Sequence, residues 1–242
     1  MKLDVLAIGV HPDDVELGCS GTLLNEIKLG KKAGILDLTQ GELGTRGTAE
    51  TRSDEAARAA AILGVVTREN LKMRDGFFKN DEAHQLLLVA AIRKYQPEIV
   101  LGNILDDRHP DHGRAGHLIA DACFLAGLVK IETKDENGQV QPRWRPKQVL
   151  HYLQDWYHEP DILVDISDVF DQRMQSILAY HTQFQTGKDG PATYISTPDF
   201  FESIIARARM MGKRIGVKYA EAFVTEKNVG IRNLDALISI ET

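Results

Sequence analysis

The sequence predicts an α/β fold, a single-domain Rossmann-like three-layer sandwich with a mostly parallel sheet and helices on both faces. Short apolar runs of strand length alternate with longer stretches that have helical periodicity or are rich in alanine, and this alternation is typical of parallel sheets covered by helices. The chain has 242 residues, of which 43% are hydrophobic and 26% charged. This is enough apolar material for one large core, so we expect residues 1–242 to form a single domain.

The expected strands are short apolar runs, as buried parallel strands usually are. They lie at residues 3–10, 33–38, 98–102, 149–153, 162–165 and 220–224. The expected helices lie between them, at residues 21–29, 50–63, 82–95, 113–126, 169–180 and 200–215. The polar segment 133–146 is rich in turn residues, so we expect it to be a surface excursion and not a domain boundary.

Composition and charge favour a small-molecule substrate. The net charge is −6, and acidic and basic side chains are mixed along the chain, so we expect no binding to nucleic acid or to an anionic membrane. The N-terminal apolar run is short, and no run of about 18 apolar residues occurs, which predicts neither a signal peptide nor a membrane span. Cys19 and Cys123 are too few for a disulfide framework. We therefore expect a cytoplasmic protein.

Two polar loops carry the residue types of a metal site. The first follows the strand 3–10 and reads His-Pro-Asp-Asp over residues 11–14, and the second follows the strand 98–102 and reads Asp-Asp-Arg-His-Pro-Asp-His over residues 106–112. In open α/β sheets, ligands bind beyond the carboxyl ends of the strands. A single His-Pro-Asp triplet is more typical of a turn with a capping Asp. Two triplets, each between a strand and a helix, favour one shared site.

These loops supply both metal ligands and groups for acid–base chemistry. Each places two ligand-type residues three positions apart, His11 with Asp14 and His109 with His112, and a proline inside each pair stiffens the backbone. Two imidazoles and one carboxylate, with a fourth position open for water, make up a catalytic zinc site. Asp13 can then act as general base, and a second histidine such as His109 can protonate the leaving group or stabilise the oxyanion. This set suits an amide hydrolase.

Residues 11–16 (HPDDVE) and 109–112 (HPDH) resemble the two signatures of the LmbE-like (PIG-L) family of N-acetylglucosamine deacetylases. The similarity extends over nearly the whole chain. The segments HPDDVELGCSGTL, TQGELGTRGTAETR and TYISTPDFFESIIARARMMGKRIGVKYAEAF are similar to the branch that removes acetate from N-acetylglucosaminyl malate in bacillithiol biosynthesis. This resemblance implies a homo-oligomer, with a hexamer as one expected form.

The resemblance also implies roles for individual residues. It implies zinc on His11, Asp14 and His112, with Asp13 as the general base. It makes His109 the protonated partner of the tetrahedral intermediate. These roles agree with the chemistry expected from the loops themselves. Fe²⁺ is an alternative occupant of the same ligands.

Further residues are expected around this centre. Asp111, beside the ligand histidines, is expected to orient an imidazole. Arg52 resembles a family arginine that contacts the substrate, and Arg46 lies near enough in the sequence to be an alternative. Tyr194 lies in the segment 186–198, whose glycine, proline and threonine content predicts a mobile loop, and it resembles a lid tyrosine.

The leading functional interpretation is hydrolysis of the acetamide of N-acetylglucosaminyl malate. A deacetylase of another N-acetylglucosamine-containing saccharide is the first alternative. A non-haem iron oxygenase is a second, because two histidines and one carboxylate also suit ferrous iron, but it leaves Asp13 and His109 without a clear role. A metal-dependent sugar-binding protein without turnover is a third, and it would not need a carboxylate beside the metal site.

Overall fold

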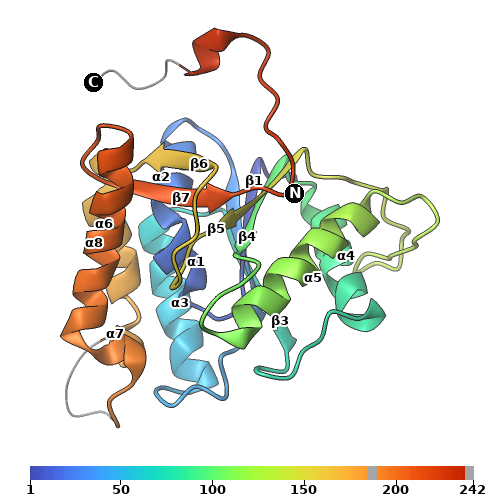
Figure 1. The fold of residues 1–242 in the computed structure, drawn as a ribbon. Helices are drawn as coiled ribbons and strands as arrows, with labels where there is room; N and C mark the ends of the chain where they lie inside the picture. Colours follow the sequence, from blue (N-terminus) through green and yellow to red (C-terminus); the bar gives the residue numbers. More distant parts are fainter. Residues whose placement is uncertain (185–189, 238–242) are drawn as a thin grey trace.

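A seven-stranded sheet runs through the computed structural model, which describes residues 1–184 and 190–237 (Figure 1). The strand order is β3-β2-β1-β4-β5-β7-β6. The first five strands in this order are parallel, whereas β7 is antiparallel to both β5 and β6. The predicted α/β fold with a mostly parallel sheet is therefore confirmed. The strands are β1 Val5–Gly9, β2 Ala33–Thr39, β3 Thr67–Met73, β4 Ile99–Asn103, β5 Gln148–Tyr152, β6 Ile162–Asp165 and β7 Ala220–Val224.

Helices cover both faces of the sheet, as predicted (Figure 1). One face is covered by α4 (Glu82–Tyr95) and α5 (Pro110–Ala126). The opposite face is covered by α2 (Ser20–Lys28), α3 (Ala49–Leu63) and α6 (Phe170–Leu178). The remaining helices are α1 Asp14–Gly18, α7 His181–Phe184 and α8 Pro198–Arg214, with 3-10 turns η1 Ser167–Val169, η2 Tyr194–Ser196 and η3 Leu234–Leu237.

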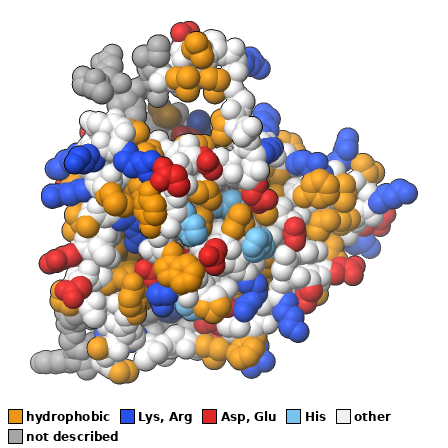
Figure 2. All heavy atoms as spheres, in the orientation of Figure 1, with side chains coloured by type: hydrophobic (Ala, Val, Ile, Leu, Met, Phe, Trp, Pro, Cys, Tyr) orange, Lys and Arg blue, Asp and Glu red, His pale blue; other side chains and the backbone are white. Residues whose placement is uncertain are grey.

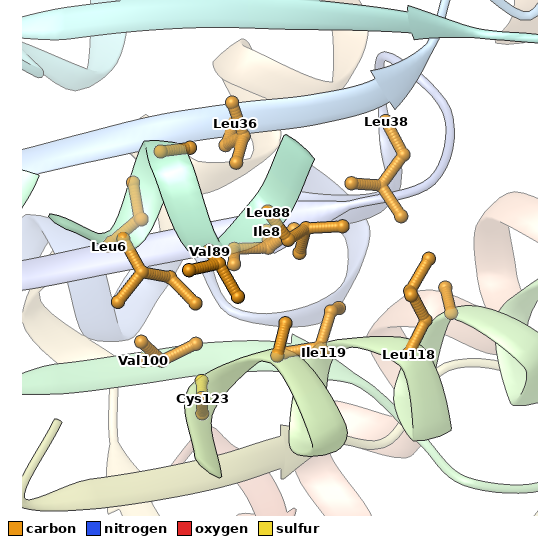
Figure 3. Packing of buried hydrophobic residues seen from close by; sticks show 14 of the residues in the cluster. Leu6, Ile8, Leu36, Leu38, Leu88, Val89, Val100, Leu118, Ile119 and Cys123 are labelled. Carbon is orange, nitrogen blue, oxygen red and sulfur yellow. The ribbon is translucent and has the colours of Figure 1, made fainter. Parts of the chain in front are cut away.

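The alternation of side chains along β1 divides the core into two parts. Successive side chains of a strand point to opposite faces of the sheet. Leu6 and Ile8 therefore belong to the cluster that also contains Leu88 and Val89 of α4 and Ile119 of α5 (Figure 3). Val5 and Ala7 belong to the cluster on the other face. All of β1 is buried, which explains why this strand is a continuous apolar run in the sequence.

The strand β3 was not predicted, because its residues form no apolar run. This strand reads TRENLKM, and most of its residues are only half-buried because it forms one edge of the sheet. Its pairing with β2 also shifts register near Asp37, and Lys72 has a φ of 53°. An edge strand with one solvated face does not need an apolar run, so the pattern used for the buried strands does not apply to it.

The predicted site loops lie where the strand order reverses. β1 and β4 are neighbours, but the chain leaves β1 toward β2 on one side and leaves β4 toward β5 on the other. Ligands of open α/β sheets bind in the crevice at such a switch point. The helix α5 begins at Pro110, three residues before its predicted start, and the short helix α1, which was not predicted, begins at Asp14. The ligand-type residues of both loops thus lie at or beside helix N-termini.

Two features lie outside this core. The predicted mobile loop at 186–198 is described only from residue 190, so its residues 186–189 lie outside the described part of the chain. After β7, the chain leaves the sheet and ends, as far as it is described, in η3 away from the body (Figure 1). Within residues 1–184 and 190–237, no helix combines the length and the apolar character needed to cross a membrane.

Candidate functional site

The loops after β1 and β4 meet in a cavity of about 390 Å³. Other walls come from segments distant in the sequence, at residues 43–46, 75–76, 154–155 and 193–195, together with Arg207 of α8. Figure 2 shows histidine side chains near the middle of one face of the molecule, with acidic and basic side chains interspersed around them. Charged side chains of both signs therefore line the cavity, which suits a small polar ligand.

The structure brings the three predicted metal ligands together. Nε2 of His112 lies 3.3 Å from Oδ1 of Asp14, and Nδ1 of His11 lies 3.8 Å from Oδ2 of the same carboxylate. One potential ligand atom from each of the three residues lies within 4.8 Å of the others. A second group, formed by His11, His109 and Asp111, satisfies the same distance condition. Because both groups include His11, they are alternative sets of ligands for one ion.

Asp14 is held rigidly at the centre of the first group. Its carboxylate accepts hydrogen bonds from the backbone N–H groups of Val10 and His11, at 2.9 and 3.1 Å. The side-chain amides of Asn103 and Gln154 donate two more, at 3.1 and 3.0 Å. Burial opposes ionisation of this carboxyl group, but the neighbouring imidazoles and the backbone hydrogen bond hold its pKa far below the usual range. Asp14 is thus an ionised, preorganised acceptor for a cation.

His112 is supported from behind by Asp107, which the sequence analysis did not select. Nδ1 of His112 lies 2.6 Å from Oδ2 of Asp107. The other oxygen of Asp107 accepts from the backbone N–H groups of Asp155 and Trp156, at 3.2 and 2.8 Å. Burial lowers the pKa of His112, but Asp14 and Asp107 together raise it to about 10. The local field therefore favours positive charge at this position, as expected of a cation site.

His11 is supported by a second carboxylate that the sequence analysis missed. Its Nε2 lies 3.0 Å from Oδ1 of Asp75, whose other oxygen accepts from the backbone N–H of Leu43 at 3.1 Å. Asp75 follows β3, the strand without a sequence signal. Each ligand histidine thus has one nitrogen facing Asp14 and the other on a carboxylate, an arrangement that fixes the ring orientation of metal-binding histidines.

Asp111, predicted to orient an imidazole, lies slightly farther from its target. Its Oδ2 is 3.9 Å from Nε2 of His11 and accepts a hydrogen bond from the backbone N–H of Gly76 at 2.9 Å. Its Oδ1 accepts from Arg114 at 2.6 Å. The direct contacts to the two ligand rings are made by Asp75 and Asp107. The predicted role of Asp111 stays a prediction.

Asp13 lies beside the ligands in a strained backbone conformation. Its φ is 138° and its ψ −21°, a region that costs a residue other than glycine about 1–3 kcal/mol. One nitrogen of Arg52 bridges the carboxylate of Asp13, at 3.0 Å, and the carbonyl of Pro12, at 2.8 Å. Burial, only partly offset by Arg52, raises the pKa of Asp13 to about 7. This carboxylate is therefore poised to exchange a proton near neutral pH.

His109 caps α5 and also faces the ligand rings. Its Nδ1 accepts the backbone N–H of Asp111 at 3.3 Å, so the proton of the neutral ring lies on Nε2. Its ring stacks on that of His112, with centroids 5.1 Å apart. Burial and the charges of His11 and His112 lower the pKa of His109. The ring is thus a fixed hydrogen-bond donor within the cavity.

The predicted substrate-binding residues all line the same cavity. Arg52 is 4% exposed, and its hydrogen bonds go to Asp13, Pro12 and Gly41. Arg46, the alternative, donates to the backbone carbonyls of Thr182 and Pro191. The structure thus brings both arginines to the cavity.

Tyr194 stands at the exposed side of the cavity, with 54% of its surface accessible. Its hydroxyl donates to Oδ1 of Asp155 at 2.9 Å. The guanidinium of Arg108 lies 4.1 Å from the centre of the tyrosine ring and also bonds to Asp155. Tyr194 is therefore tied to the loop after β5 by its own hydroxyl and by Arg108. Closure of Tyr194 over the site stays a prediction.

Comparisons with known proteins agree with this geometry. Residues 6–123 match the protein family described as PIG-L: GlcNAc-PI de-N-acetylase, and this range includes both ligand loops. The diacetylchitobiose deacetylase of Thermococcus kodakarensis is 32% identical over 190 residues, which cover 74% of this chain and 70% of that protein. A probable N-acetyl-alpha-D-glucosaminyl L-malate deacetylase 2 of Bacillus subtilis is 26% identical over 195 residues, or 76% of this chain and 84% of the relative.

A solved structure matches the whole fold. The conserved protein TT1542 from Thermus thermophilus superposes with a TM-score of 0.84 at 38% sequence identity. The match covers 95% of this chain and 97% of that one. The similarity therefore extends beyond the ligand loops to the helix α8 and the antiparallel strand β7.

Proposed function

Because the chain belongs to the PIG-L family of GlcNAc-PI de-N-acetylases, we propose that it is a hydrolase that removes the acetyl group from an N-acetylglucosamine derivative. The observation that carries this proposal is the arrangement of the cavity. A buried carboxylate, Asp13, and a hydrogen-bond donor, His109, both lie beside a group of three metal-ligand side chains. Amide hydrolysis needs a base for the attacking water, a hydrogen-bond donor for the developing oxyanion and a group that polarises the carbonyl, all beside the same amide.

His11, Asp14 and His112 would hold a divalent cation, which we propose to be zinc. Two imidazoles and one carboxylate are typical ligands of catalytic zinc, and the carboxylates behind both rings support such a set. Fe²⁺ also suits these ligands. When bound, such an ion acts as a Lewis acid toward the acetyl carbonyl and makes water more acidic.

Asp13 is the proposed general base. Its carboxylate accepts a proton from the attacking water, whose oxygen bonds to the acetyl carbon. When the carbon–nitrogen bond breaks, the leaving nitrogen takes up this proton, so the products are the free amine and acetic acid, which ionises to acetate. The contact with Arg52 holds this carboxylate in place. His109 donates from Nε2 to the carbonyl oxygen as negative charge develops there, because its Nδ1 is already occupied.

Separating the base from the ligands tests this assignment. Asp13→Asn should keep the bound metal but lower acetate release by ~10²–10⁴-fold, the usual contribution of a positioned general base. His11→Ala and His112→Ala should lose the metal, measured by elemental analysis after dialysis. Asp54→Asn, an exposed carboxylate on α3, is the matched control. Full activity of the Asp13 variant would refute the mechanism.

Reaction type and metal identity need separate tests. Acetate release in the absence of oxygen would exclude the non-haem iron oxygenase interpretation, because hydrolysis consumes only water. Tight binding of an acetylated sugar without released acetate would instead favour a binding protein without turnover. Assays of apoprotein reloaded with Zn²⁺ or Fe²⁺ then identify the active metal independently of the reaction.

We propose N-acetylglucosaminyl malate as the substrate. The similarity to the probable malate deacetylase of Bacillus subtilis supports this choice. The cavity also contains four arginines, which suit a substrate with carboxylate groups. They are Arg46, Arg52, Arg108 and Arg207.

Diacetylchitobiose is a second candidate, because the relative that acts on it is 32% identical to this chain. It is neutral, so it offers the arginines only hydroxyl and amide groups. Acetate release from N-acetylglucosamine, its malate conjugate and diacetylchitobiose should be compared at equal concentrations. A higher kcat/KM for the malate conjugate supports the first candidate, and a higher value for the disaccharide supports the second.

A further inference from the structure

Three of the four arginines in the cavity are already bonded to protein groups. Arg52 bridges Asp13 and the backbone. Arg108 pairs with the carboxylate of Asp155. Arg46 donates to two backbone carbonyls. These contacts use much of the hydrogen-bonding capacity of the three side chains and hold them in place without a ligand.

Arg207 differs from the other three. It lies on α8, is half-buried, and lines the cavity together with the ligand residues. Within residues 1–184 and 190–237, its guanidinium makes no hydrogen bond or ion pair. Burial and the positive charge of Arg173 lower its pKa, and the charges of Asp155 and Asp107 only partly compensate. A half-buried cation without a partner is costly, and a bound anion would remove this cost.

We propose that Arg207 is the residue that recognises a carboxylate on the group attached to the amino sugar. This inference rests on the proposed deacetylase function and adds the chemical class of the second half of the substrate. A guanidinium presents a planar fork that matches a carboxylate through two parallel hydrogen bonds. The acetamide would lie at the ligands that follow β1 and β4, whereas Arg207 comes from α8 and lines the same cavity. The substrate would therefore span these two walls.

The neighbourhood of Arg207 explains why this arginine and not Arg108 is assigned the role. Arg108 already has a carboxylate partner in Asp155, and its guanidinium also stacks on Tyr194. An incoming anion at Arg108 would compete with Asp155. At Arg207 the incoming anion would instead pair with a guanidinium that has no carboxylate partner among the described residues. The residue would thus determine specificity by binding the group attached to the sugar, and it should act on KM more than on kcat.

Kinetics with charged and neutral forms of one substrate test the assignment. For Arg207→Gln, the KM for N-acetylglucosaminyl malate should rise ~10–100-fold, as expected for the loss of charge-assisted hydrogen bonds. The KM for its dimethyl ester should change less than about twofold, and kcat should be retained for both. Arg209→Gln, two positions along α8 and exposed, is the matched control and should behave as wild type. An equal rise of KM for acid and ester, or no rise, would overturn the proposal.

A binding measurement keeps this inference separate from the proposed function. Glucosaminyl malate, the deacetylated product, can be titrated calorimetrically into wild type and into Arg207→Gln, with glucosamine as the neutral probe. Weaker binding of the malate compound alone supports the carboxylate contact even if no tested substrate releases acetate. If wild type releases acetate but binds the malate compound no better than glucosamine, the deacetylase stands and this inference fails. Matching circular dichroism spectra of the two variants verify folding.

Discussion

Replacing Asp107 by asparagine should weaken metal binding without removing a ligand. The carboxylate is fully enclosed and links the ring of His112, at 2.6 Å, to the backbone N–H groups of Asp155 and Trp156. An asparagine has one acceptor oxygen and one donor NH₂ group. If its oxygen stays on His112, its NH₂ faces two N–H groups, and if it turns over, the ring loses its acceptor. Either orientation leaves one buried contact broken.

The size of this effect follows from the broken contact. A hydrogen bond to a charged group contributes about 1.5–3 kcal/mol, and about 1.4 kcal/mol corresponds to a tenfold change in affinity. We therefore expect Asp107→Asn to bind zinc ~10–100-fold more weakly, in the range found for groups behind metal-binding histidines. Burial alone would raise the pKa of Asp107, but the hydrogen bonds with His112 and with backbone N–H groups lower the pKa below its usual range. The wild-type carboxylate is therefore ionised at neutral pH.

Competition with a chromophoric chelator measures this affinity directly and does not depend on turnover. Asp106→Asn, the exposed neighbouring residue, makes the same chemical change without the contact and should bind zinc as wild type does. Wild-type affinity in Asp107→Asn would refute the reasoning that this carboxylate supports the ligand ring. Equal weakening in both variants would indicate a general charge effect in place of the specific hydrogen bond.

Two further changes test the packing that holds the site. Glu221→Gln should lower the free energy of unfolding by about 3–5 kcal/mol in urea denaturation, because it breaks the buried ion pair with Arg173. It also removes the carboxylate that accepts hydrogen bonds from backbone N–H groups at the N-terminus of α2. An equal loss of stability in the exposed control Glu202→Gln would contradict this prediction. Gly18→Ala would place its Cβ 2.2 Å from the ring of buried Tyr152. Overpacking of about 1–3 kcal/mol should lower Tm by ~2–12 °C, and Gly230→Ala, with open space around it, should leave Tm unchanged.

The sequence by itself determined the fold class and the position of the centre. β1 and β4 are buried on both faces, so their residues form apolar runs that are visible without a structure. The loops after them contain His11, Asp14 and His112 within short segments, and parallel strands bring their carboxyl ends to one edge of the sheet. These three side chains are accordingly found within reach of one ion.

Only the tertiary structure decided which groups support the centre from behind. Asp75 follows the polar edge strand β3, which has no apolar signal, and its contact to His11 spans 64 positions of sequence. Gln154 reaches Asp14 from the loop after β5. Asp107 was visible in the second loop, but its spacing did not distinguish it from Asp106, and the place of Asp111 beside the ligand histidines favoured that residue instead. The orientation of each side chain decides which aspartate contacts a ligand histidine. This orientation depends on where α5 begins and on the backbone groups that each aspartate contacts.

The same holds for Arg207. As one of several arginines on an amphipathic helix, it has no distinguishing pattern in the sequence, and Arg209 lies only two positions away. The packing of α8 beside β7 turns Arg207 toward the cavity and leaves Arg209 exposed. Local spacing therefore determines which residues can form a metal centre, because its ligands lie close together along the chain. The rest of the cavity depends on contacts between distant segments, which only the packed structure specifies.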